Sequence, residues 1–384
     1  MKKPIDPKKT MLAHSEAKVE FFKKYLERYL RILYLAPSVE AINVFDVFCG
    51  TGIYDNDKKG SPIVAFDAIK SLRETYDYTK KINLVVNDSK ETKVSSVQNY
   101  INSNNKNYCN VNYQNQTAEL MFKEVVNSIN TQNAKSRNLI FIDPYGYKEI
   151  KKTTLLSLLQ NNRTEIILFL PISQMQRFTV AAIESELKPY EPLKEFVYSF
   201  FNEDHPIRKQ TVSAIDYLNY VKEALRFNNY YSASYYIERD ERNYYGLFFI
   251  SPHIYALEKI LEVKWQLDED DGKGFKQPEM QSSLFSLQDK ELKKNDNYAR
   301  LEKILKDSLK TPKNNQELYK IILEHEFLPK HAAEVFRNWQ KDLSNFSVTE
   351  ILTNKPARKN SFYITWEWFN PAVHSKPKVK FELK

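Results

Sequence analysis

Glycine and cysteine are scarce in this chain of 384 residues: there are seven glycines and two cysteines. Average glycine usage, roughly 7 %, would give several times as many. Cys49 and Cys109 have no cysteine or histidine partners at the spacing of a zinc site, so we expect no metal. No apolar run approaches the length of a membrane span and no signal peptide is evident, which predicts a cytoplasmic protein.

The scarce glycines are concentrated after one predicted strand. Residues 42–48 are rich in β-branched and aromatic side chains, as is typical of a buried strand, and Gly50, Gly52 and Gly60 follow. Glycine permits positive φ angles and lets a ligand approach the main chain closely. We therefore expect this turn to lie against a small molecule at the C-terminal edge of a parallel sheet.

The residues of the turn exclude two common nucleotide loops. Asp55 stands where a dinucleotide fingerprint needs its third glycine, and no P-loop Gly-Lys-Ser/Thr follows. What remains, Asp46-x-Phe48-x-Gly50-x-Gly52, resembles motif I of class I S-adenosylmethionine-dependent methyltransferases. The resemblance implies that the glycines make room for the methionine part of the cofactor and that Asp46 helps to hold its charged end. These four residues are candidate cofactor-binding residues, and an ordinary strand-to-helix turn is the alternative.

Two further stretches complete the predicted cofactor site. A second strand, 81–88, ends in Asp88, whose carboxylate could accept bonds from both ribose hydroxyls. Asp88 lies further from the glycine turn than the usual spacing of roughly 20 residues, and an isolated aspartate is more often a helix cap. A short strand, 110–115, is followed by Gln116 where this architecture reads the adenine edge, and by Thr117, which could instead cap the next helix.

A buried strand at 138–142 ends in Asp143, Pro144 and Tyr145. Both this edge and the glycine turn should open on the same crevice. The triplet resembles the Asp-Pro-Pro-Tyr motif of methyltransferases that act on exocyclic amines of bases. The resemblance implies that the acid and the proline carbonyl accept bonds from the amine and that the ring stacks on the base. This chain has one proline and adds Gly146, and a type I or II turn is the alternative.

The other elements predict an α/β fold: a Rossmann-like class I methyltransferase sheet in residues 1–266. A helix at 14–35 precedes the glycine strand, and Ser61 and Pro62 are expected as N-cap and first residue of the next helix. A fifth strand at 164–170 leads into a helical insertion at 172–229. Strands at 232–238 and 244–250, joined by a hairpin at 239–243, form the final antiparallel pair before a helix at 253–265.

The C-terminal part predicts a second module. Acidic, glycine-, glutamine- and serine-containing sequence at 267–297 is typical of a linker. Residues 298–384 then predict three helices (298–309, 315–325, 329–343) and two strands (around Val348 and at 362–366), a winged-helix-like pattern. The net charge is +8, and basic residues lie near the third helix and the predicted wing (Lys330, His331, Arg337, Lys341; Lys355, Arg358, Lys359). We expect nucleic acid as partner, although many winged helices bind protein.

Taken together, the chain resembles the three-Cys-motif partner (TcmP) proteins of bacteria. The matching blocks are Lys18 to Leu30, Asp46 to Gly50, Gly60 to Pro62, Phe141 to Gly146 and Gly246 to His253. Family members more often have alanine at the position of Cys49. The resemblance implies a methyltransferase-like fold and a companion protein with three cysteines that itself looks like a radical enzyme, and it implies no known substrate.

Two functions remain open. The first is an S-adenosylmethionine-dependent methyltransferase acting on nucleic acid, in which Asp143 and the Pro144 carbonyl align an amine acceptor and Tyr145 stacks on the base. The second is a methyltransferase-like, non-catalytic subunit that binds or regulates its partner. The intact set of acids and glycines favours the first, since a decayed site would be expected to lose some of them.

Overall fold

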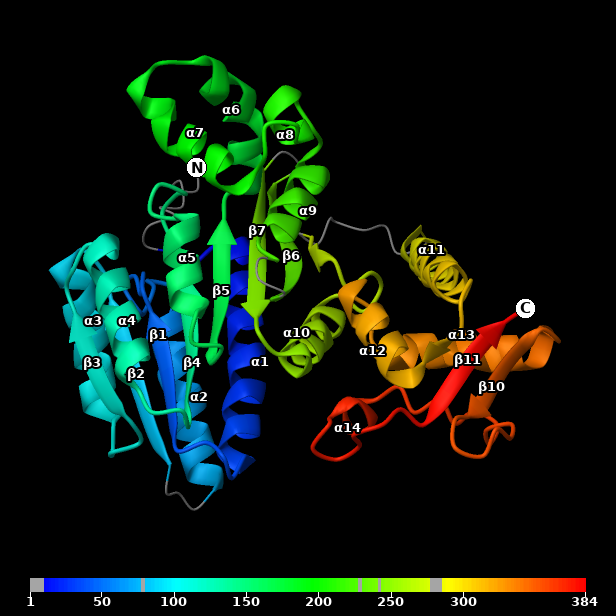
Figure 1. Ribbon diagram of the computed structural model, residues 1–384. Helices are drawn as coiled ribbons and strands as arrows, with labels where there is room; N and C mark the ends of the chain where they lie inside the picture. The colour runs from blue at the N-terminus through cyan, green and yellow to red at the C-terminus, as the bar shows by residue number, and fades with distance from the viewer. Residues whose placement is uncertain (1–9, 77–79, 227–229, 241–242, 277–284) are drawn as a thin grey trace. The chain divides into compact units, whose positions relative to one another are not determined.

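The computed structural model describes residues 10–76, 80–226, 230–240, 243–276 and 285–384, with no side chains described for 285–294. The chain divides into two compact units (Figure 1). Unit 1 is Met1–Pro252 with Lys273–Gln277, and unit 2 is His253–Gly272 with Pro278–Lys384. The domain boundaries expected from the sequence, 1–266, 267–297 and 298–384, stay a prediction.

Unit 1 is built on an eight-stranded sheet in the order β3-β2-β1-β4-β5-β7-β6-β8. Its first five strands pair in parallel, and β7 runs antiparallel to both β5 and β6. This mixed α/β sheet matches the predicted Rossmann-like methyltransferase sheet with its final antiparallel pair. The strands are β1 (Ala41–Asp46), β2 (Lys81–Asn87), β3 (Asn110–Gln114), β4 (Ser136–Ile142), β5 (Thr164–Leu170), β6 (Tyr231–Asp240), β7 (Asn243–Ser251) and β8 (Gly274–Phe275).

Helices cover both faces of this sheet (Figure 1). The amphipathic pattern expected at 14–35 forms α1 (Ala13–Leu35), whose Phe22 ring stacks on Phe141 of β4 at 4.4 Å. The remaining helices before β5 are α2 (Ser61–Thr75), α3 (Glu91–Asn104), α4 (Ala118–Thr131) and α5 (Lys152–Leu159). The predicted insertion contains α6 (Ile172–Glu184), η1 (Lys188–Tyr190), α7 (Glu191–Phe200), α8 (Pro206–Lys209) and α9 (Ala214–Ala224). Residues 227–229 of that insertion and 241–242 of the expected hairpin lie outside the described residues.

The expectation for the start of α2 was wrong by one residue. Gly60 is the N-cap, so Ser61 is the first helical residue and Pro62 the second. Ser61 is buried, and its hydroxyl faces the carboxylate of Asp46 instead of capping the helix. The Ser61 side chain therefore faces Asp46 at the end of β1 and does not cap its own helix.

A row of polar side chains crosses five neighbouring strands of the sheet. The amide of Asn43 donates to Oδ1 of Asn138 at 3.0 Å, and that of Asn83 donates to Oδ1 of Asn43 at 2.6 Å. The amide of Asn110 on β3 donates to Oδ1 of Asn83 at 3.2 Å. At the other end of the row, the amide of Asn138 donates to the hydroxyl of Thr164 on β5 at 3.3 Å. All five residues are register partners, and Asn43, Asn138 and Thr164 are buried, so a slip of one residue in a central strand would leave buried polar groups without their partners.

Unit 2 combines helices with a three-stranded antiparallel sheet in the order β10-β11-β9. Its elements are α10 (Ile254–Leu267), α11 (Phe285–Ser308), β9 (Lys313–Asn314), α12 (Asn315–Glu324), α13 (Pro329–Asp342), β10 (Phe346–Glu350), α14 (Trp366–Phe369) and β11 (Val379–Leu383). Helix α11 begins at Phe285 rather than at residue 298, because the sequence 285–294 is rich in helix formers although it lacks a clear apolar stripe. Residues 277–284 of the expected linker lie outside the described residues.

The strand expected at 362–366 was wrong, because the partner of β10 is β11. Phe362 and Ile364 are buried, which explains their alternating apolar pattern, but Tyr363 between them has a left-handed φ of 53° that no regular strand accommodates. The segment therefore fills the core of unit 2 as a loop.

Helix α10 packs on the other helices of unit 2 through buried polar contacts. Lys264, with 1 % of its side chain exposed, forms an ion pair with Glu326 at 2.8 Å. The indole N–H of Trp265 donates to the Glu326 carbonyl at 3.0 Å, and its ring lies 4.3 Å from that of His331. Burial lowers the pKa of His331 to about 4, so this half-buried ring is neutral near pH 7 and does not add to the positive charge of α13.

In the part of the chain that the structure describes, no helix is long and apolar enough to cross a membrane. The cytoplasmic location stays a prediction.

Candidate active site

The glycine turn follows β1 directly, at the C-terminal edge of the sheet. Gly50 and Gly52 have φ angles of 63° and 78°, which favour glycine. A side chain at Gly52 would come within 2.8 Å of Val97 Cγ2, whereas nothing lies within 4 Å of a side chain placed at Gly50. Close packing against Val97 thus leaves no room for a side chain at Gly52, whereas the main chain of Gly50 is open to the cleft.

Asp46 ends β1 beneath this turn and is fully buried. Neither of its carboxylate oxygens has a hydrogen-bond partner of good geometry among the described residues. Its pKa is raised to about 7, mainly by burial and also by the nearby Asp143, while the facing Ser61 hydroxyl and Phe48 N–H offset part of this rise. A buried carboxylate without a partner is unfavourable, so the site is suited to a group that brings positive charge.

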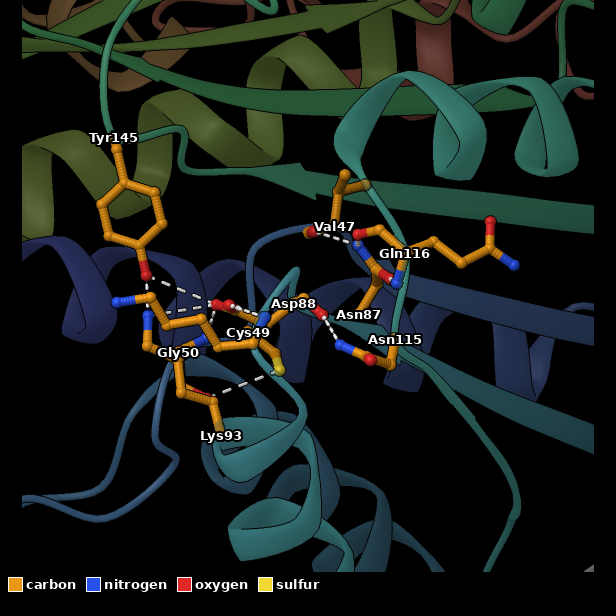
Figure 2. Close-up of polar contacts among 10 residues, drawn as sticks. Val47, Cys49, Gly50, Asn87, Asp88, Lys93, Asn115, Gln116 and Tyr145 are labelled. Atoms are coloured by element: carbon orange, nitrogen blue, oxygen red, sulfur yellow. Dashed lines mark hydrogen bonds and ion pairs between the residues drawn. The ribbon is translucent and has the colours of Figure 1, made fainter.

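Asp88, directly after β2, has nearly all its accepting capacity in use (Figure 2). Its Oδ2 accepts from the Gly50 N–H at 3.2 Å and from Lys93 Nζ and Tyr145 Oη, each at 3.3 Å. Its Oδ1 accepts from the Lys90 N–H at 3.0 Å. Ribose hydroxyls at this carboxylate would have to replace the Lys93 and Tyr145 side chains, since the other two donors are main chain.

Asn87 holds the ends of three strands together, a role that sequence reasoning missed. Its amide donates to the carbonyls of Val47 and Gln116, at 3.0 and 3.2 Å, and its Oδ1 accepts from the Gln116 N–H at 3.0 Å (Figure 2). The Gln116 side chain itself donates to Glu124 at 2.6 Å. Thr117 is the N-cap of α4. The segment that we expect to face the adenine is therefore positioned through its main chain.

Asp143 forms an ion pair through Oδ2 with Nζ of Lys18, which comes from α1. The Lys18 side chain is 13 % exposed, and its Nζ also lies 4.6 Å from the centroid of the Phe169 ring. This role could not be predicted from local sequence, because the two residues are 125 positions apart. The only available signal was that Lys18 begins the first matching block of the family resemblance.

Tyr145 connects the predicted acceptor residues with the predicted cofactor residues. Its side chain is 74 % exposed, and Figure 2 shows it reaching toward Asp88 and Lys93. Its hydroxyl is hydrogen-bonded to Lys93 Nζ, which lies 4.6 Å from the centroid of the tyrosine ring. The loop after β4 and the first turn of α3 thus meet through the side chains of Tyr145 and Lys93.

A cleft of about 240 Å³ lies between these elements. One wall is aromatic: the His14 ring stacks on Tyr245 at 5.4 Å, and Tyr245 stacks on Phe169 at 5.0 Å. Burial, with Arg239 and Lys18 nearby, lowers the pKa of His14 to about 4 and keeps this ring neutral. The lining comes from α1, the glycine turn with its loop, the loop after β4, and β5 and β7 (His14, Ser15, Lys18, Val19; Phe48, Cys49, Gly50, Tyr54, Gly60, Ser61; Asp143, Pro144, Tyr145; Phe169, Tyr245).

The start of α1 is fastened to the loop that follows the glycine turn. The main chain of Met11 exchanges two hydrogen bonds with the Asn56 side chain, at 3.3 and 3.2 Å, and Lys58 forms an ion pair with Glu16 at 2.6 Å. These contacts hold two walls of the cleft together, so Lys18 is presented to Asp143 from a fixed helix.

The chain is similar to solved methyltransferase structures at low sequence identity. No protein-family model and no curated protein sequence matches the chain. Among solved structures, it is similar to the bifunctional kinase-methyltransferase WbdD at 12 % identity and a TM-score of 0.35, over 65 % of this chain and 45 % of that one. An O-methyltransferase from Bacillus cereus in complex with SAH matches at 12 % identity and a TM-score of 0.33, over 65 % of this chain and 93 % of that one. The O-methyltransferase TomG from Streptomyces achromogenes, in complex with SAM, matches at 10 % identity and a TM-score of 0.31, over 62 % and 87 %.

The match to WbdD spans less than half the length of that chain. At these identities and TM-scores the fold assignment rests on the strand order of the sheet, and the chemistry rests on the residues at its edge.

Proposed function

We propose that the chain is an S-adenosylmethionine-dependent methyltransferase that acts on nucleic acid. The observation that carries this proposal is the buried, unpartnered carboxylate of Asp46 beneath a turn that is open at Gly50. S-adenosylmethionine supplies a methyl group on a positively charged sulfur, and its ammonium group is the kind of cation that Asp46 lacks. Asp88 and the Gln116 segment would bind the cofactor's ribose and adenine, and Phe48 lines the cleft beside Gly50.

The acceptor side is proposed to be the loop after β4. Lys18 holds Oδ2 of Asp143, which leaves Oδ1 as the oxygen that can accept a hydrogen bond from the acceptor. Together with the Pro144 carbonyl, it would orient an exocyclic base amine for in-line transfer, a contribution of alignment rather than of covalent chemistry. Tyr145, the most exposed ring in the lining, is available to stack on a base once it leaves Asp88.

Nucleic acid as the acceptor is supported by the net charge of +8 and by the elements of unit 2. We propose that α11 to α13 with β9 to β11 form the winged-helix-like domain, whose third helix carries Lys330, Arg337 and Lys341. The three-cysteine companion protein follows from the TcmP resemblance and belongs to the same proposal.

A second function is favoured by one observation: Asp88 is already satisfied by four donors. A site closed in this way suits a methyltransferase-like subunit that regulates its partner without turnover. Tyr145→Phe separates the two functions, because it removes one donor from Asp88 and keeps the ring. In an enzyme, this variant binds cofactor at least as tightly as the parent.

The test is calorimetric titration of the full chain with S-adenosylmethionine and, separately, with NAD, beside a methyl-transfer assay on cellular nucleic acid. The proposal predicts binding of the methyl donor and not of NAD. Asp143→Asn should reduce turnover far more than cofactor affinity, because it keeps the shape and one oxygen. Cofactor binding without transfer to any nucleic acid would favour the regulatory subunit, and binding of NAD alone would overturn both.

A further inference from the structure

The hairpin that follows β10 presents apolar side chains to solvent at its tip. Ile351 is 44 % exposed and Leu352 is 83 % exposed, the largest exposed fraction of any large hydrophobic side chain in the described residues. Thr353 and Asn354 complete the tip and are also exposed. Two adjacent apolar side chains at the end of a projection are unusual for a surface that otherwise carries polar residues there.

The tip has a defined shape because main-chain hydrogen bonds close the hairpin. The Glu350 N–H donates to the Lys355 carbonyl at 2.8 Å, and the Asn354 N–H donates to the Glu350 carbonyl at 2.9 Å. Asn354 adopts a left-handed φ of 53°, which asparagine tolerates in turns. Below the tip, Val348 is buried opposite Phe381 of β11, so the projection is anchored in the core of unit 2.

Positive charge surrounds this tip. Residues 351–381 contain six lysines and arginines and one acid, Glu367. Lys378 and Lys380 are paired with Glu350 and Glu382, at 3.5 and 2.7 Å. In the part of the chain that the structure describes, no carboxylate lies within ion-pair distance of Lys355, Arg358 or Lys359, which directly follow the tip.

We propose that this hairpin is a wedge for double-stranded DNA: Ile351 and Leu352 enter between two base pairs from the minor groove, and Lys355, Arg358 and Lys359 bind the flanking phosphates. Proteins that insert wedges into the minor groove combine aliphatic side chains with adjacent cations in this way. The inference rests on the proposed nucleic-acid acceptor. It adds that the nucleic acid is double-stranded DNA and that the hairpin after β10 contacts it. Unstacking at the wedge would also lower the cost of bringing a base out of the helix.

Charge and size favour DNA over the other anionic surface that such a tip could meet. Two aliphatic side chains bury too little area to hold a protein on a bilayer, where even a single acyl chain binds only marginally. One base step, by contrast, is filled by one or two such side chains. A-form RNA presents a wide and shallow minor groove, whereas side-chain wedges of this kind enter the minor groove of DNA. The wedge therefore fits B-form DNA better than an RNA duplex.

The experiment uses the full chain and a DNA duplex that contains 2-aminopurine, whose fluorescence rises when the base unstacks. The parent should bind and raise the fluorescence severalfold. The double variant I351S/L352S should lose most of this rise and bind about tenfold more weakly with an unchanged salt slope. Leu187→Ser, at a leucine of unit 1 that is 65 % exposed, is the matched control and should behave like the parent.

A triple variant tests the phosphate contacts. K355Q/R358Q/K359Q should reduce the slope of log affinity against log salt by about 2–3. Parental binding without a fluorescence rise would overturn the wedge and leave the nucleic-acid acceptor standing. If the same preparation binds S-adenosylmethionine but no duplex, the wedge and the nucleic-acid acceptor both fail while the cofactor assignment survives. An equal fluorescence rise with an RNA duplex would also overturn the DNA wedge. The same holds if I351S/L352S loses binding to anionic vesicles but binds the DNA duplex like the parent.

Discussion

Nζ of Lys18 is paired with Oδ2 of Asp143, so a helix near the start of the chain determines how the predicted acceptor acid is oriented. Lys18 lies over the Phe169 ring and is mostly shielded from solvent, which limits the directions that its ammonium group can take. The pair leaves one carboxylate oxygen of Asp143 for a ligand. Lys18 is therefore a positioning residue for the proposed reaction.

Replacing Lys18 by Gln should reduce turnover about 100-fold, because a reacting group displaced by about 1 Å loses that much. Cofactor affinity should stay at the parental value, and Lys18→Arg should restore part of the rate. The measurements are the methyl-transfer rate and calorimetry with S-adenosylmethionine. Lys24→Gln, which removes a solvent-facing partner of Glu20 on the same helix, serves as control. Parental turnover in Lys18→Gln would show that the ion pair is only structural.

Asp46 should make the native state less stable as pH rises. The ordinary pKa of 3.8 is raised to about 7 by burial, so between these values the native chain holds a proton that the unfolded chain has lost. The free energy of unfolding therefore falls from about pH 4 to pH 7. Asp46→Asn removes this dependence and should be more stable than the parent at pH 8 by a few kcal/mol, at about 1.4 kcal/mol per pKa unit.

Urea unfolding of parent and Asp46→Asn at pH 4 and pH 8 measures this difference. The two proteins should agree at pH 4, where both side chains are neutral. Glu165, whose pKa burial also raises to about 7, is present in both and cancels in the comparison. The variant should also lose cofactor binding, because an amide offers no charge to an ammonium group. Equal stability at pH 8 would mean that the Asp46 carboxylate is already compensated.

Gly50 and Gly52 should respond differently to the same substitution. Gly50→Ala meets no atom within 4 Å and should cost only the strain of a left-handed alanine, about 1–2 kcal/mol. Gly52→Ala adds a clash with Val97 Cγ2 and should cost about 1–3 kcal/mol more. Thermal unfolding gives the stability of each variant, and titration gives the cofactor affinity. Gly50→Ala should weaken the cofactor while the protein stays folded, and unimpaired binding would place the ligand elsewhere.

Helix α10 should be needed for unit 2 to fold. A fragment of residues 253–384 keeps the Lys264–Glu326 ion pair and the Trp265 contacts, whereas 298–384 leaves their apolar partners bare. The longer fragment should unfold cooperatively in circular dichroism, and the shorter one should aggregate or bind a hydrophobic dye. A cooperative transition in the 298–384 fragment would support the domain boundary that the sequence suggests.

Local patterns were sufficient to predict most elements of unit 1. The strands that lead to Asp46, Asp88 and Asp143 are dominated by apolar residues, and the structure forms a strand at each of these places. Strand β1 ends at Asp46 rather than at residue 48, and β2 ends at Asn87, one residue before the predicted end. Strands β1 and β4 are almost entirely buried, and their hydrophobicity separates them from the polar turns that follow.

Features that depend on distant parts of the chain could not be predicted. Nothing near Lys18 indicates that its partner is Asp143, and the buried alternation of Phe362 and Ile364 imitates a strand although this described segment pairs with no strand. The four asparagines of the sheet were visible in their strands, but only the register shows that they meet. Whether the predicted site residues act as proposed is a question of chemistry that the experiments above address.

The polar row across the sheet has a consequence for synthesis of the chain on the ribosome. Asn43 and Asn138 are separated by 95 positions, and the row closes only when Thr164 of β5 joins it. Before β4 is made, β1 to β3 can pair with one another, but Asn43 lacks Asn138 and the edge of β1 is open. Before β5 is made, Asn138 lacks Thr164 and the edge of β4 is open. A nascent chain that pauses before residue 164 therefore exposes an open strand edge, of β1 or of β4, and such an edge is prone to pair with another chain.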